Sequence, residues 1–121
     1  MKIMHMNRII VAGLLVASPF LSAETVHLPQ AIEHTRLAIK HGEANDAAQL
    51  MDQASAALEH AKASEDIEAN AHTEEGITHL KAAVEAGKLG DADGGSIHAR
   101  DALKELEMAT EPKKDRSASN Q

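Results

Sequence analysis

The chain has 121 residues, a formal net charge of −7 and no cysteine, so we expect one small acidic domain without disulfides. An acidic surface argues against a nucleic-acid partner, because phosphates are bound by clusters of Lys and Arg. The lack of cysteine excludes thiolate metal sites and cysteine nucleophiles. Phe20 is the only Phe, Tyr or Trp, so the core must be built from aliphatic residues and Met, a composition that favours helices.

Residues 1–23 have the pattern of a cleaved export signal. Lys2 and Arg8 precede a short apolar run, and we expect cleavage after Ala23. The alternative is a membrane anchor, but the run is far shorter than the roughly 20 residues that a spanning helix needs. Loss of Lys2 and Arg8 would leave 10 basic and 19 acidic residues, a net charge of −9. The sequence therefore predicts an exported protein without stable membrane insertion, folded over residues 24–110.

A first pair of helices is expected directly after this signal. In the first helix apolar residues recur at three- and four-residue spacing, Pro29 suits the first turn, and Gly42 is interpreted as the stop. Asn45 or Asp46 can cap a second helix, which is expected to run to Ser64. Because the link between them is short, the two helices should form an antiparallel hairpin.

A third helix is expected after an acidic connector, residues 65–71, although the second helix could instead continue into this connector. Thr73 is a suitable N-cap for the third helix, and acidic residues follow it in the first turn. Gly87 and Gly90 are interpreted as its end.

A fourth helix should begin at Asp91 or Asp93, both of which are good N-caps. The pair Gly94-Gly95 makes a poor first turn, so regular helix is expected only from Ser96. The Pro-, Lys- and Ser-rich segment 111–121 is expected to be a disordered tail.

The sequence repeats itself after 45 residues. In the first helix of each pair, His27, Ile32, His34, Ile39 and Gly42 correspond to His72, Ile77, His79, Val84 and Gly87. In the second, Asp46, Ala54, Ala57 and Leu58 correspond to Asp91, Ala99, Ala102 and Leu103. Two tandem helical hairpins with one apolar stripe per helix predict an all-α, antiparallel, up-down-up-down four-helix bundle, expected to be a monomer. The alternatives are a hairpin that pairs with a second chain and a solenoid, for which two repeats are too few.

Histidines on these helices give the main indication of function. Those of the mature chain are His27, His34, His41, His60, His72, His79 and His98. A spacing of seven residues places rings on one stripe but about 10 Å apart along the helix axis, so three of them cannot bind one ion together. Partners must come from three or four residues away, as Glu75 does for His72 and His79, or from a neighbouring helix.

Antiparallel pairing predicts which residues stand level with one another. In the first hairpin, level residues have numbers that add up to 87, which pairs His27 with His60, His34 with Gln53 and His41 with Asp46. In the second hairpin the total is 177, which pairs His72 with Glu105, His79 with His98 and Ala86 with Asp91. His98 also has Asp101 one helical turn further on.

Imidazole combined with carboxylate suits Cu(II), Ni(II) and Zn(II), and the order of intrinsic affinities favours Cu(II). The candidate ligands are His27, His34, His41, His60, His72, Glu75, His79, His98 and Glu105. Two ligands per level leave positions for water, so we expect several modest sites. Because the histidines lie beside the apolar stripe, pH sensing and a structural or partner-binding module with incidental histidines are the alternatives. No nucleophile–base set or cofactor motif occurs in the sequence, so we do not expect an enzyme.

The chain resembles the periplasmic small metal-binding proteins of bacteria, which are exported, cysteine-free, His-rich helical bundles. The segments that carry the resemblance are Ile32-Glu-His34, Ala38-Ile-Lys-His41-Gly42-Glu, Leu58-Glu-His60-Ala-Lys-Ala and Gly76-Ile-Thr-His79-Leu, within residues 26–107. The resemblance implies binding of several divalent ions, copper above all, for storage, buffering or detoxification, through the seven histidines named above. Gln53, Ala86 and Glu105 stand where a richer member would hold histidine, so this chain should bind fewer ions or bind them more weakly.

Overall fold

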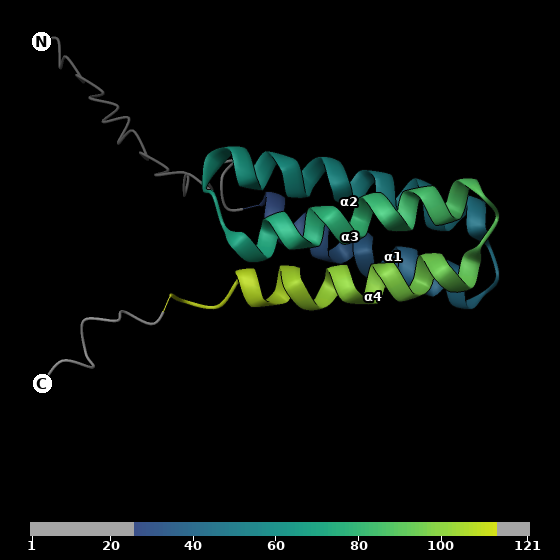
Figure 1. Ribbon diagram of the computed structural model, residues 1–121. Coiled ribbons are helices and arrows are strands. Elements are labelled where there is room, and N and C mark those ends of the chain that lie inside the picture. The colour runs from purple at the N-terminus through teal and green to yellow at the C-terminus, as the bar shows by residue number, and fades with distance from the viewer. Residues whose placement is uncertain (1–25, 114–121) are drawn as a thin grey trace, which may run out of the picture.

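The computed structural model describes residues 26–113, which form four antiparallel helices (Figure 1). The helices are α1 (His27–Glu43), α2 (Ala47–Ile67), α3 (Ala71–Lys88) and α4 (Ala92–Ala109). Both α1 and α3 pack against α2 and α4, so the helices close an up-down-up-down bundle without a strand among the described residues. The predicted all-α four-helix bundle is therefore confirmed. The predicted signal, residues 1–23, lies outside the described residues, as does the predicted tail beyond residue 113.

The two hairpins, α1–α2 and α3–α4, turn in the same way. Asn45 and Gly90 have positive φ angles of 58° and 73°, the left-handed conformation that ends many helices. The amide of the next residue, Asp46 or Asp91, donates a 2.9 Å hydrogen bond to the carbonyl five residues earlier. The carboxylates of Asp46 and Asp91 then cap α2 and α4 by accepting backbone hydrogen bonds of 3.0 and 2.8 Å. One aspartate thus closes the first helix of each hairpin and starts the second, which fixes the register between them.

The helices α1 and α3 end one residue after Gly42 and Gly87, so these two predicted stops were wrong, whereas Gly90 follows the end of α3 in the left-handed conformation, as predicted. Both glycines are buried, and α1 and α3 continue past them. A Cβ atom at Gly87 would lie 2.7 Å from the Cβ of Met51, and one at Gly42 would lie 2.6 Å from Cδ1 of Leu50. Gly87 is therefore needed for close contact with α2, and Gly42 for close contact with both α2 and α4.

Two other predicted helix ends differ from the structure, and at a third the structure confirms the stated alternative, in which the second helix continues into the connector. Asn70 caps α3 through a 2.9 Å hydrogen bond from the His72 amide, whereas Thr73 is buried inside the helix. The helix α4 begins at Ala92 and includes Gly94-Gly95, and a Cβ atom at Gly95 would lie 2.7 Å from the side chain of Leu50, which packs against the helix there. The second helix continues to Ile67 and so takes up part of the predicted connector.

The core consists mainly of alanine, with a few large aliphatic side chains. Leu50, Leu80 and Leu106 are fully buried among alanines from all four helices. Small side chains bring the helices close together, so residues beside the apolar stripes of paired helices also approach each other. Within residues 26–113, no helix is both long and apolar enough to cross a membrane.

Candidate metal centre

The predicted register is confirmed by side-chain contacts in both hairpins. In the first hairpin, Nδ1 of His27 lies 3.2 Å from Nδ1 of His60, and Nδ1 of His34 lies 2.8 Å from Oε1 of Gln53. In the second hairpin, His72 contacts Glu105 at 2.8 Å, and the rings of His79 and His98 lie 6.4 Å apart between centroids. Each of these pairs has the predicted residue numbers.

Three half-buried imidazoles form what we call the first-hairpin cluster: His27, His34 and His60. The His60 ring is 5.5 Å from each of the other two, and it stacks on His34 at an interplanar angle of 8°. Burial lowers the pKa of His60, and the neighbouring His34 and His27 lower it further by charge repulsion. The cluster therefore favours a neutral His60, the form in which imidazole binds a metal ion.

The separation of His27 and His60 suits two ligands of one ion. Metal–nitrogen bonds of about 2.0–2.1 Å allow ligand atoms to stand no more than roughly 4 Å apart, and the two Nδ1 atoms are 3.2 Å apart. In the metal-free protein one Nδ1 donates a hydrogen bond and the other accepts it. His34 donates its Nδ1 proton to Gln53, which leaves the lone pair of Nε2 available.

The most complete ligand group lies in the second hairpin. We call His79, His98 and Asp101 the second-hairpin site; one ligand atom from each lies within 4.8 Å of the others. The buried Nδ1 of His98 has no hydrogen-bond partner among the described residues. An unpaired nitrogen costs free energy in a folded protein unless something binds it, so the site fits an ion. Small side-chain rotations would bring the ligand atoms to the roughly 4 Å separation of a shared ion.

Next to this site, His72 and Glu105 form a histidine–carboxylate pair. The carboxylate accepts the Nδ1 proton of His72 at 2.8 Å, so Nε2 keeps its lone pair. Such pairs orient histidine ligands in metalloproteins and raise their basicity. Glu105 therefore orients the His72 ring through this hydrogen bond, and it is also a candidate ligand itself.

Two of the predicted ligands are not brought to a partner. His41 stands level with Asp46 as predicted, but the Asp46 carboxylate caps α2, and only the backbones of the two residues are hydrogen bonded. Glu75 is exposed, and it takes part in no hydrogen bond or ion pair among residues 26–113. Conversely, Asp101 belongs to this ligand group but was not among the ligands predicted from the sequence. Its spacing of three residues from His98 is the sequence feature that could have identified it.

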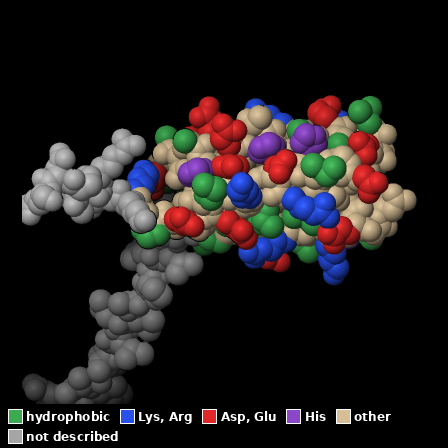
Figure 2. Space-filling model, turned by 60° about the horizontal axis from the view of Figure 1, so that its bottom comes forward, with side chains coloured by type: hydrophobic (Ala, Val, Ile, Leu, Met, Phe, Trp, Pro, Cys, Tyr) green, Lys and Arg blue, Asp and Glu red, His purple; other side chains and the backbone are tan. Residues whose placement is uncertain are grey.

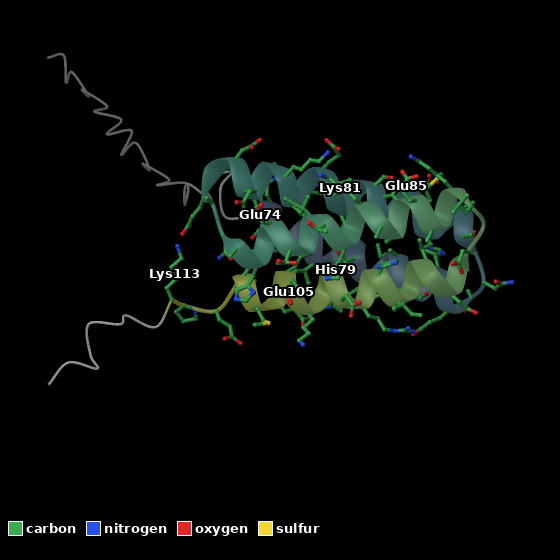
Figure 3. All side chains as sticks on the ribbon, viewed as in Figure 1. Glu74, His79, Lys81, Glu85, Glu105 and Lys113 are labelled. Carbon is green, nitrogen blue, oxygen red and sulfur yellow. The ribbon has the colours of Figure 1, made fainter. Side chains whose placement is uncertain are left out.

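The candidate ligands of the second hairpin lie along one side of the bundle. Figure 2 shows histidine side chains spaced along this surface with acidic side chains between them. In Figure 3, His79 and Glu105 lie where α3 and α4 run side by side, whereas Glu74, Lys81 and Glu85 lie on a different face of α3. The histidines of the first hairpin lie on α1 and α2 and form a separate group.

The family comparison agrees with this ligand chemistry. The model of the small metal-binding protein family matches residues 1–111, which is nearly the whole chain. A search of curated proteins finds no match. The family description names metal binding and no enzymatic activity. With half-buried imidazoles paired across both hairpins, and a family match over this length, the chain belongs to the small metal-binding protein family.

Proposed function

We propose that this chain is an exported protein that binds several divalent transition-metal ions, with copper first and nickel or zinc next, for metal storage, buffering or detoxification. The observation that carries this proposal is the second-hairpin site, in which two imidazoles and a carboxylate lie within 4.8 Å of one another. Mixed nitrogen and oxygen ligands suit Cu(II) and Ni(II), and Cu(II) has the highest intrinsic affinity of the divalent series.

The proposed ligands comprise those expected from the sequence together with Asp101. His79, His98 and Asp101 hold one ion, and His27 and His60, with His34 beside them, hold another. His72, Glu75, Glu105 and His41 add weaker positions, at which water supplies most of the coordination. The excess of acidic residues attracts cations to these surfaces.

The proposed location and state follow from the sequence pattern. Residues 1–23 act as a signal that is removed on export to the periplasm, and residues 24–110 form a monomeric domain. Because the exported chain has no cysteine, imidazole and carboxylate are the principal metal-binding groups of the folded domain.

A structural or partner-binding role is the alternative. Its support is the exposure of apolar side chains at the surface, since Leu89 is 85% and Ile97 is 57% exposed. Under this alternative the histidines are incidental, and the chain binds no divalent ion specifically.

Native mass spectrometry of the full chain with Cu(II), Ni(II) or Zn(II) separates the two functions. Metal binding predicts at least one retained Cu(II) ion at total metal on the order of tens of micromolar. A chain that retains no ion under these conditions has the alternative function.

The second-hairpin site is tested by His79→Ala, His98→Ala and the double variant. If both rings bind one ion, each single change weakens Cu(II) binding about as much as the double change does. Additive losses would show that the two histidines bind independently. Asp101→Asn should also weaken this site, whereas Asp52→Asn, the same change at another exposed position, should not.

A further inference from the structure

A cavity at one end of the bundle is lined by a methionine, whose thioether is a ligand type that the proposed divalent sites do not use. It has a volume of about 660 Å³ and lies beside the connection between α2 and α3 and the end of α4. Its lining includes Asn70, His72, Met108, Glu111 and Lys113. The cavity therefore places an imidazole and a thioether on the walls of one open space.

The orientation of His72 leaves the correct nitrogen for this cavity. Its Nδ1 is bound to Glu105, which does not line the cavity, whereas His72 itself does. Nε2, the ring nitrogen that does not contact Glu105, is therefore the one left for an ion bound in this space. Because Glu105 accepts the Nδ1 proton, Nε2 holds an available lone pair.

Met108 supplies the second group. It follows Glu105 by three residues on α4, so the two side chains lie on the same face of the helix, and Met108 is closer to the cavity end. Met108 is 38% exposed, unlike Met51, which is half-buried and packs against the core. An unbranched thioether with three rotatable bonds can turn toward a bound ion.

We propose that His72 and Met108 form a site for a soft monovalent ion, Cu(I) or its redox-inert analogue Ag(I). Thioether ligands select Cu(I), whereas the harder divalent ions prefer nitrogen and oxygen. Lys113 also lines the cavity, with its ammonium group 3.3 Å from Glu68, and a positive charge repels a monovalent ion less than a divalent one. In Figure 3, Lys113 lies beyond the start of α3, at the same end of the bundle.

The first hairpin has no equivalent of this site. His27 corresponds to His72 after the 45-residue shift, but Ala63 takes the place of Met108. The same backbone position therefore has an imidazole without a thioether. This site extends the proposed function from divalent ions to the reduced form of copper.

The test is a titration of the full chain with Ag(I), followed by the ¹³C-labelled ε-methyl signals of methionine in NMR spectra. Met108→Leu and Met51→Leu assign the two signals, so methionines elsewhere in the chain are observed separately. Ag(I) should shift the Met108 signal and leave the Met51 signal unchanged. In His72→Gln, the Ag(I) concentration at the midpoint of the Met108 shift should rise at least about tenfold.

Two outcomes would overturn the site: a Met108 signal that does not move with excess Ag(I), and one that moves with the same midpoint in His72→Gln. A circular dichroism spectrum of each variant confirms that the helices remain folded. Met108→Leu should leave Cu(II) binding at the second-hairpin site unchanged. Failure of Cu(II) binding thus contradicts the divalent function alone, and failure of the Ag(I) shift contradicts this site alone.

Discussion

The two hairpins have the same backbone frame but different ligand chemistry. Both use an aspartate after a left-handed residue to set the register, and both place two histidines on their first helix at equivalent positions. Their returning helices differ at the positions that face these histidines. Gln53, Ala56 and His60 in α2 correspond to His98, Asp101 and Glu105 in α4.

These three differences redistribute the ligands along each hairpin. In the first hairpin, His60 lies between His27 and His34, so the three imidazoles cluster. The residue that stands level with His34 is Gln53, whose side chain is a neutral amide. In the second, the carboxylate of Glu105 takes the place of His60, and the second imidazole moves to the level of His79, beside Asp101. A repeated frame can therefore produce one all-imidazole cluster and one mixed site by substitutions on a single helix.

The largest effect is expected when the second hairpin is given the residues of the first. His98→Gln with Asp101→Ala leaves His79 as the only ligand of its site. Cu(II) affinity there should fall about 100-fold or more, since loss of groups that only support a ligand already costs 10–100-fold. Isothermal titration with Cu(II) should show one fewer bound ion. An unchanged number of ions would contradict the second-hairpin site.

The reverse exchange should create a site in the first hairpin. Gln53→His with Ala56→Asp places an imidazole and a carboxylate beside His34, and the affinity for an added ion should rise about tenfold. The gain is smaller than the loss above because Ala56 is half-buried, so the new carboxylate is partly desolvated, whereas Asp101 is exposed. The same titration measures it, with Gln53→His alone as the control. No gain over this control would show that the two frames are not equivalent.

The equivalent glycines should differ in the stability that they provide. A methyl group at Gly87 meets the Cβ and Cα atoms of Met51 at 2.7 and 3.1 Å, which cannot move without the backbone. A methyl group at Gly42 meets the movable ends of the Ser96 and Leu50 side chains first, and the nearest backbone atom, the carbonyl oxygen of Ala92, lies 3.0 Å away. Gly87→Ala should therefore lower the free energy of unfolding by about 1 kcal/mol more than Gly42→Ala does. Urea denaturation measures both, and equal or reversed costs would contradict the packing difference.

Much of this fold could be predicted because one pattern occurs twice. The apolar spacing predicts the helices, and the short links with Asp46 and Asp91 predict the register, which the contacts of His27 with His60 and of His72 with Glu105 confirm. Pairing across a hairpin depends on local turn geometry, which is encoded in a few adjacent residues.

The remaining features depend on contacts between distant segments. Gly42 and Gly87 resemble helix stops in the sequence, but their role is set by side chains from α2 and α4 that no local pattern shows. Thr73 is a residue type that often caps helices, yet it is buried within α3 because Asn70 starts the helix one turn earlier. The approach of Asp101 to His79 likewise depends on how closely α3 and α4 pack.

The smallest expected effect concerns the response of the two hairpins to acid. The pKa of His60 lies below its ordinary value of 6.5, so between these two values the unfolded chain binds a proton at His60 that the folded chain does not. The stability of the metal-free protein is therefore fully retained above pH 6.5 and falls as the pH decreases through the lowered pKa.

The first-hairpin cluster is where this loss arises, because protonation of both His27 and His60 places two donors against each other. In the second hairpin, Glu105 takes the place of His60, so this pair of histidines is absent. Urea denaturation above and below pH 6.5 should show this loss, and His60→Gln should reduce it, whereas Lys62→Gln on the same helix should not. An acid dependence that is the same with and without His60 would place the proton-sensitive group outside the first-hairpin cluster.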